Sequence, residues 1–211
     1  MFVEKTIFIV GAGASVEAGL PTGEQLIPQI VEFLDPAHSD FREHVRYAPM
    51  LPEADDDRRR NTAMMEAAAK RIVKGIHGSF SIDNFIDENR HDPFVEAIGK
   101  FAIAKTILDA ERNSKMSVDA TNIYNELNLA KLRGTWYTKL SSLLFEGCTV
   151  DEVAERLSHV TFIIFNYDRC VEHYLFWALR LTYGLTNQEA ANLLANVTIF
   201  HPYGQVGPLP F

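Results

Sequence analysis

Three short apolar runs along the chain have the pattern of strands in a parallel sheet. They lie at 6–10, 160–165 and 197–200, and each is rich in β-branched or aromatic residues. A short continuous apolar run is typical of a strand that is buried on both faces. A glycine-bearing or polar segment follows each run directly, so the sequence predicts three strands with a motif at the end of each.

Between the runs, apolar residues recur three and four positions apart, which predicts helices. These patterns lie at 23–34, 62–76, 93–112, 118–146 and 169–183. Capping-box sequences predict two further helix starts, at Thr149 with Glu152 and at Thr186 with Glu189. Thr22 is expected to cap the first helix, and Pro28 inside that helix predicts a kink or an early stop. We interpret the charged run at 53–61 as a solvated loop, with a docking patch as the alternative.

Strands that alternate with helices indicate an α/β fold with an open parallel sheet. We expect a Rossmann-like sheet with helices on both faces and a large helical insertion at approximately 36–158. A length of 211 residues suits a single domain spanning 1–211. In such sheets ligands bind beyond the carboxyl ends of the strands, which is where all three motifs fall.

Composition excludes several classes of function. The chain carries 20 basic and 28 acidic side chains, for a net charge of −8, so direct binding to nucleic acid is not expected. Its two cysteines, Cys148 and Cys170, cannot form a four-cysteine zinc site, and no metal is expected. The apolar run at the N-terminus is too short for a signal peptide or a membrane helix, so we expect a cytoplasmic protein without membrane contact.

The first motif is GAGASVEAGLP at 11–21. Glycines between a strand and a helix let backbone N–H groups approach a pyrophosphate, and the helix dipole assists. Gly11 and Gly13 fit the dinucleotide fingerprint, but its third glycine position holds Val16 and no acidic residue follows a second strand. A tight structural turn therefore stays open as the alternative.

The other two motifs carry polar side chains. In FNYD at 165–168, Asn166 suits a ribose hydroxyl or a water, and Asp168 suits an amide NH2 group. In HPYG at 201–204, His201 is placed to act as a general base. The alternatives are a strand-end turn for FNYD and a packed histidine before a proline turn for HPYG.

Together the three motifs resemble the sirtuin-like family, and they are most similar to bacterial NAD hydrolases of that family from antiphage defence. The resemblance implies a Rossmann-type domain that binds NAD. Gly11, Ala12, Gly13 and Ser15 would then line the phosphate and ribose region, and Pro21 would lie near the cofactor. Asn166 would place the attacking water or hold the nicotinamide ribose, Asp168 would bind the carboxamide, and His201 would contact the ribose hydroxyls and serve as base. The segment SIDNFID at 81–87 matches a motif of that branch at Asp83 and Phe85, which implies that Asp83 is a further cofactor-binding residue.

The chain also departs from the family. Thr22, Gly23 and Glu24 stand where members often have Asp-Phe-Arg, and the zinc module of protein deacetylases is absent. Members continue past the histidine motif with further strands, whereas this chain stops ten residues after His201. The sheet is therefore expected to be incomplete at its C-terminal end, and the chain to be the N-terminal part of a longer protein.

The resemblance implies hydrolysis of NAD to nicotinamide and ADP-ribose, with NAD as substrate, in antiphage defence. It also implies a homo-oligomer or a partner domain that contacts the helical insertion. Two alternatives stay open. One is a module that binds NAD or ADP-ribose without turnover, and the other is an NAD-dependent deacylase or ADP-ribosyltransferase.

Overall fold

The computed structural model describes residues 4–35, 41, 55–119, 121 and 125–210 of the chain. These residues form two compact units. The first unit comprises the described residues within Met1–Leu20 and Ile107–Phe211, and the second comprises those within Pro21–Thr106. All three strands belong to the first unit, so this unit contains the α/β part of the protein.

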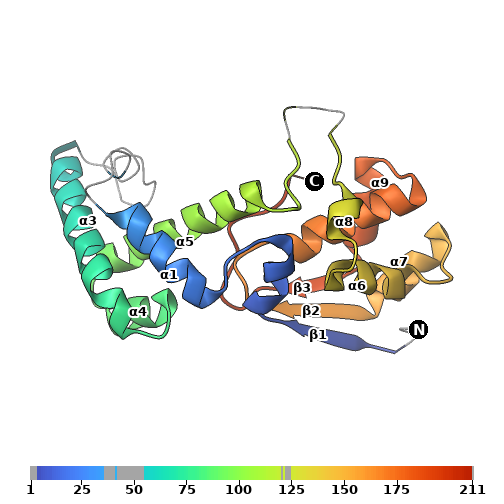
Figure 1. Ribbon diagram of the computed structural model, residues 1–211, viewed down its shortest axis with the longest axis horizontal. Helices are drawn as coiled ribbons and strands as arrows, with labels where there is room; N and C mark the ends of the chain where they lie inside the picture. Colours follow the sequence, from blue (N-terminus) through green and yellow to red (C-terminus); the bar gives the residue numbers. More distant parts are fainter. Residues whose placement is uncertain (1–3, 36–40, 42–54, 120, 122–124, 211) are drawn as a thin grey trace. The chain divides into compact units, whose positions relative to one another are not determined.

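The first unit is built on an open parallel sheet with the strand order β1-β2-β3 (Figure 1). β1 is Thr6–Val10, β2 is Val160–Ile164 and β3 is Thr198–Phe200, which confirms the three expected strands. Phe8 pairs with Phe162, which pairs with Ile199, and the rings of Phe8 and Phe162 stack with centroids 5.1 Å apart. Since all three strands run in the same direction, the segments that follow them leave the sheet at one edge.

Short helices complete the first unit. They are η1 (Ala12–Ala18), η3 (Leu129–Leu132), α6 (Trp136–Phe145), α7 (Val150–Ser158), α8 (Cys170–Tyr183) and α9 (Asn187–Leu194). Both capping boxes are confirmed, because the carboxylates of Glu152 and Glu189 accept the backbone N–H groups of Thr149 and Thr186 at 2.8 Å. Buried side chains of α6, α7 and α8 join those of β2 in one hydrophobic core.

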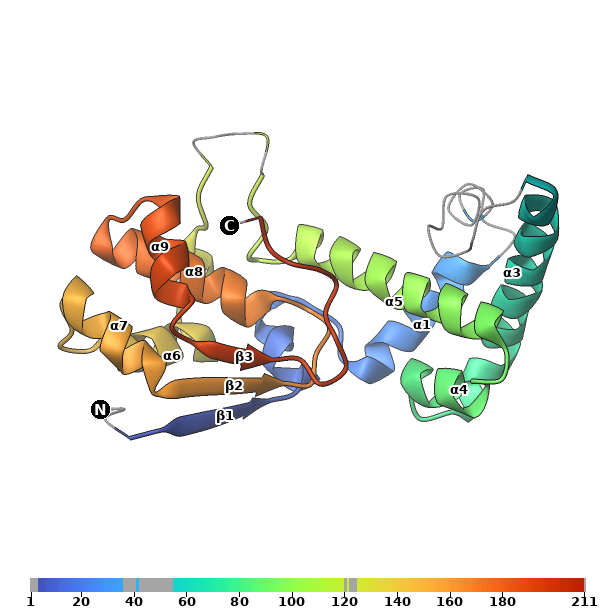
Figure 2. The same ribbon diagram turned by 180° about the vertical axis from the view of Figure 1, so that it is seen from behind.

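The core lies on one face of the sheet. Val160 and Phe162 are fully buried, whereas Ile7, Ile9 and Phe200 are 61%, 75% and 57% exposed. Figure 2 shows the helices α6, α7, α8 and α9 on the same side of the three strands. Successive side chains of a strand point to opposite faces, so each strand contributes only alternate residues to the core. The expectation of strands buried on both faces is therefore wrong for β1 and β3, and the described helices of the first unit that pack on the sheet lie on one face only.

The second unit is helical. It contains α1 (Gly23–Leu34), α3 (Asp55–Gly75), η2 (Ile76–Gly78), α4 (Ile82–Glu88) and the first part of α5 (Pro93–Asn113), whose last turns belong to the first unit. Thr22 caps α1 as expected, but the helix continues past Pro28 to Leu34, so the early stop was wrong. Proline removes one helical hydrogen bond, and the buried side chains of Ile30 and Leu34 hold the following turn in place. Residues 55–61 of the charged run belong to α3, so the expected loop is wrong for these residues, and residues 53 and 54 lie outside the described part of the chain.

The expected insertion at approximately 36–158 does not coincide with either unit. The second unit covers 21–106, while η3, α6 and α7 belong to the unit that contains the sheet. The helix expected at 118–146 is present only as η3 and α6 within the described residues. Residues 36–40 and 42–54 of the expected insertion lie outside the described residues.

Candidate functional site

The glycine motif forms a short 3₁₀ helix directly after β1. Gly11 precedes η1 with an extended backbone (φ −107°, ψ 172°), and Gly19 ends it in the left-handed region (φ 100°). A Cβ atom built on Gly11 or Gly13 would meet no other atom within 4 Å, and both residues are exposed. The fold itself therefore does not require glycine at these two positions, and the backbone there is open to a ligand. A seven-residue 3₁₀ helix does not supply the long helix dipole that we expected to assist a bound pyrophosphate.

Asn166 follows β2 and binds the glycine motif. Its amide nitrogen donates to the carbonyl oxygen of Gly11 and to the hydroxyl oxygen of Ser15, both at 3.1 Å. These two contacts show which atom of the Asn166 amide is the nitrogen, because the amide oxygen in that place would face the carbonyl oxygen of Gly11. The amide oxygen of Asn166 is buried and has no hydrogen-bond partner among the described residues. Asn166 therefore joins the ends of β1 and β2 and keeps one unused acceptor.

Asp168 lies against the same serine. One carboxylate oxygen accepts the hydroxyl of Ser15 at 2.8 Å, and the other accepts the backbone N–H of Cys170 at 3.1 Å. Burial raises the pKa of the Asp168 carboxyl, and the charge of Glu111 adds to this effect, although the two hydrogen bonds act in the opposite direction. Asp168 and Ser15 are 5% and 2% exposed, so this contact belongs to the interior of the first unit.

His201, which follows β3, is bound at both ring nitrogens. Nδ1 lies 2.9 Å from the backbone carbonyl oxygen of Asn166, and Nε2 lies 2.7 Å from a carboxylate oxygen of Glu172 in α8. Burial lowers the pKa of His201. The hydrogen bonds with Glu172 and Asn166, together with the negative charges of Glu172 and Asp168, outweigh burial and leave this pKa raised. The structure thus brings the ends of all three strands into one hydrogen-bonded cluster, with Asn166 at its centre.

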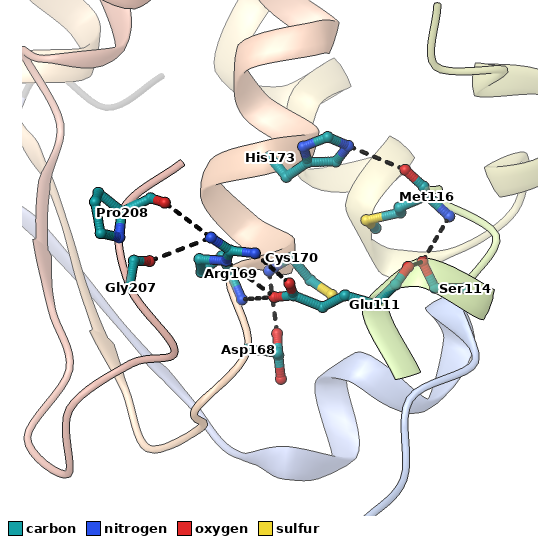
Figure 3. A network of polar contacts seen from close by, with 9 residues as sticks. All are labelled: Glu111, Ser114, Met116, Asp168, Arg169, Cys170, His173, Gly207 and Pro208. Atoms are coloured by element: carbon teal, nitrogen blue, oxygen red, sulfur yellow. Dashed lines mark hydrogen bonds and ion pairs between the residues drawn. The ribbon is translucent and has the colours of Figure 1, made fainter. Parts of the chain in front are cut away.

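Arg169 fixes the loop that carries this cluster. Figure 3 shows its guanidinium between Glu111 near the end of α5 and the carbonyl groups of Gly207 and Pro208. The guanidinium forms an ion pair with Glu111 at 2.5 Å and donates to the two carbonyl oxygens at 3.3 and 2.9 Å. The backbone N–H of Arg169 also donates to Glu111, at 2.9 Å. One side chain therefore joins α5, the loop after β2 and the C-terminal segment.

Sequence reasoning missed several residues that hold the site. Glu172, Arg169 and Glu111 belong to no recognised motif, and their partners lie 29 to 58 positions away along the chain. Trp136 was also missed; its indole N–H donates to the carbonyl oxygen of Ala14 at 2.7 Å and supports η1 from α6. The only available signal was the position of Glu172, an acidic residue in the first turn of a helix that directly follows FNYD.

Two of the expected cofactor-binding residues lie in the second unit. Pro21 is its first residue, and Asp83 is exposed in the first turn of α4. The segment SIDNFID forms a capped helix, in which Ser81 accepts the backbone N–H of Asn84 and Phe85 is buried. Helix capping and packing account for this motif within its own unit.

The described residues contain no group of three or more His, Cys, Asp or Glu side chains that could hold a metal ion. Within the same ranges, no helix combines the length and apolar character needed to cross a membrane.

Comparisons of the chain with protein-family models, curated proteins and solved structures give no match. Any functional assignment therefore depends on the cluster itself.

Proposed function

We propose that the first unit binds NAD at the carboxyl edge of its sheet and hydrolyses the bond between nicotinamide and ribose. The observation that carries this proposal is the convergence of the three strand-end motifs on Asn166, which contacts Gly11, Ser15 and His201. Parallel α/β sheets bind ligands at this edge. The assignment to the sirtuin-like family, with its Rossmann-type fold and its setting in antiphage defence, is part of the same proposal.

The glycines support a ligand that approaches the backbone. Gly11 and Gly13 are exposed and have open space where a side chain would stand. Close approach of a ligand explains glycine at a position where the backbone geometry does not require it. In this proposal Gly11, Ala12, Gly13 and Ser15 line the phosphate and ribose region of NAD.

Asn166 and Asp168 have the acceptor capacity that the reaction requires. Both hydrogens of the Asn166 amide are used within the protein, so its buried amide oxygen is the atom that would hold a water. Asp168 accepts two hydrogen bonds, and an ionised carboxylate has about four acceptor positions. A carboxamide NH2 group can therefore be accepted without loss of Ser15 or Cys170.

A second candidate function is an NAD or ADP-ribose binding module without turnover. The observation that favours it is the state of His201, whose two ring nitrogens are both engaged by Asn166 and Glu172. A general base needs a free nitrogen within reach of the proton that it removes. Hydrolysis in this site therefore has to depend on alignment of water and sugar, or on release of His201 from one partner.

The two functions can be separated by following nicotinamide and ADP-ribose release from NAD alongside NAD-dependent thermal stabilisation. Asn166→Ala is expected to reduce turnover by about 100-fold or more, since misplaced reacting groups cost that much. Asn192→Ala, an exposed residue of α9, is the matched control and should leave turnover unchanged. Stabilisation by NAD without turnover would select the binding module, and absence of both would refute the proposal.

Gly13→Val gives a test that does not disturb the hydrogen-bonded cluster. A Cβ at this position meets nothing within 4 Å, so there is room for the start of a side chain, and thermal unfolding without NAD checks that the variant folds. Its side chain would occupy the space proposed for the ligand, so the NAD-dependent rise in the melting temperature should disappear. If NAD stabilises Gly13→Val as much as it stabilises the original chain, the ligand does not bind against this backbone.

A further inference from the structure

Among the described residues, Glu172 is the ionisable side chain that is hydrogen-bonded to His201, and none of the three motifs contains it. It lies in the first turn of α8, and its carboxylate oxygen Oε1 is 2.7 Å from Nε2 of the His201 ring. The side chains of His201 and Glu172 are 7% and 14% exposed, so water screens this pair only weakly. The pair links the end of β3 to α8 within the first unit.

Both hydrogen-bond partners of the ring are acceptors. The carbonyl oxygen of Asn166 faces Nδ1 and the carboxylate of Glu172 faces Nε2. A neutral imidazole donates from only one nitrogen, and its other lone pair would then face an oxygen. Against an ionised Glu172 carboxylate, only the doubly protonated ring satisfies both contacts, and each ring nitrogen then donates one hydrogen bond.

The ionisable groups around the ring favour the same state. Glu172 from α8 and Asp168 from the loop after β2 both add negative charge near His201. The second carboxylate oxygen of Glu172 is buried without a hydrogen-bond partner among the described residues. The charged ring of His201 therefore compensates a carboxylate that is otherwise poorly solvated.

We propose that Glu172 is a positioning residue of this site, which holds His201 as a charged double donor and thereby fixes the backbone of Asn166. This inference deepens the proposed NAD hydrolysis and depends on it for its kinetic readout. A ring held in this way does not accept a proton from a ribose hydroxyl. The working form of the site is the protonated one, so turnover decreases on the alkaline side as His201 loses its proton.

The sharpest perturbation is Glu172→Gln, which keeps the shape of the side chain and removes its charge. A glutamine amide can donate to Nε2, so the variant stabilises the neutral ring in nearly the same position. Glu155→Gln, in an exposed position on α7, is the matched control. Thermal unfolding of both variants shows whether each still folds.

The first readout is the NMR titration of the His201 ring, assigned by the signal that is lost in His201→Gln. Glu172→Gln is expected to lower the titration midpoint by about one pH unit or more, because an adjacent opposite charge commonly shifts a pKa by that much. Glu155→Gln should leave the midpoint unchanged. An unchanged midpoint in Glu172→Gln would overturn the inference.

The second readout is the pH profile of NAD hydrolysis. In Glu172→Gln the alkaline decrease in kcat should move to lower pH, with KM changed much less than kcat, because Glu172 acts through His201 and not on the substrate. A merely structural residue would lower kcat at all pH values without moving the profile. That result would also contradict the inference.

The outcomes separate this inference from the proposed function. If the original chain does not cleave NAD but the His201 midpoint falls in Glu172→Gln, the proposed function fails and the role of Glu172 stands. If NAD is cleaved while neither the midpoint nor the profile moves, the role of Glu172 fails alone. Should Glu172→Gln not fold, ring ¹⁵N shifts of the original chain decide the matter, since a singly protonated His201 at pH 7 would refute the charged double donor.

Discussion

Removal of the Arg169 guanidinium should weaken the contacts of the loop after β2 with both α5 and the C-terminal segment. Arg169 pairs with Glu111 and also binds the carbonyl groups of Gly207 and Pro208 (Figure 3). Arg169→Met keeps an unbranched apolar side chain of similar reach and removes all of these contacts. It also leaves the carboxylate of Glu111, which is 17% exposed, without its opposite charge.

The expected loss of stability follows from this burial. Breaking a buried ion pair by removing one partner costs about 3–5 kcal/mol, and an exposed pair contributes about 0–1 kcal/mol. With Arg169 and Glu111 15% and 17% exposed, the pair is close to the buried case. We therefore expect Arg169→Met to cost about 2–4 kcal/mol. Glu111→Gln keeps part of the hydrogen bonding and should cost about 1–2 kcal/mol.

The double variant is the decisive comparison. Residues that share one ion pair couple by about 0.5–3 kcal/mol, so the loss in Glu111→Gln/Arg169→Met should be smaller than the sum of the two single losses. Urea unfolding followed by tryptophan fluorescence measures the correct unit, because both tryptophans, Trp136 and Trp177, belong to the first unit. The amide of Val206, which donates to the carbonyl oxygen of Tyr167 at 3.1 Å, should also exchange faster in Arg169→Met. Additive losses, or a loss in Arg169→Met below about 1 kcal/mol, would refute the reasoning.

Three further predictions concern the cluster and the glycines. Ser15→Ala removes one of the two donors to Asp168. The free energy of unfolding should fall by about 1.5–3 kcal/mol at neutral pH and by less in acid, where Asp168 is protonated. Urea unfolding at both pH values measures this difference. Because the folded-state pKa of His201 is raised, its contribution to stability is complete below the unfolded value of about 6.5 and is lost as the pH rises through the folded pKa. Melting temperatures between acid and alkaline pH should show this decrease in the original chain and not in His201→Gln. Gly13→Ala should change the free energy of unfolding by less than about 1 kcal/mol. Gly99→Ala should destabilise the second unit, because a Cβ atom at position 99 would lie 2.7 Å from the side chain of Ile86. Thermal unfolding compares the two variants.

The parts of the fold that depend on neighbouring residues were predictable. The capping boxes at Thr149 and Thr186 involve residues three positions apart, and both helices begin where these boxes predict. The strands were recognisable because each short apolar run ends at a glycine or polar residue. Burial of the strands was not predictable in the same way. Ile7 and Ile9 have the same apolar character as the buried residues of β2, but the described helices of the first unit that pack on the sheet lie on its other face.

The charged run at 53–61 shows a different limit of prediction from local sequence. Seven of its nine residues, 55–61, belong to α3, and residues 53 and 54 lie outside the described part of the chain. A polar segment without apolar periodicity is typical of a loop, yet a helix can continue through it when the adjoining turns are packed. The buried side chains of Met65, Ala69 and Ile72 later in α3 provide that packing. Local pattern therefore predicted the apolar part of this helix and missed its polar start.

The candidate site shows most clearly which features local sequence predicts and which depend on packing in the folded chain. Asn166, Asp168 and His201 were identifiable because parallel strands end at the same edge, and the structure joins them through Ser15 and the Asn166 backbone. Glu172 could not be identified in this way. Its contact with His201 depends on how the first turn of α8 packs beside the end of β3, and neighbouring residues do not determine that.

The hydrogen bonds within the cluster limit the chemistry of any ligand that it recognises. The amide hydrogens of Asn166 donate within the protein, and both ring nitrogens of His201 already have hydrogen-bond partners there. The remaining capacity is that of acceptors, on the amide oxygen of Asn166 and the carboxylate of Asp168. A group bound there must bring hydrogen-bond donors, as a carboxamide, a sugar hydroxyl or a water does. A pyrophosphate offers only acceptors and has to bind elsewhere, and the open backbone at Gly11 and Gly13 meets that requirement.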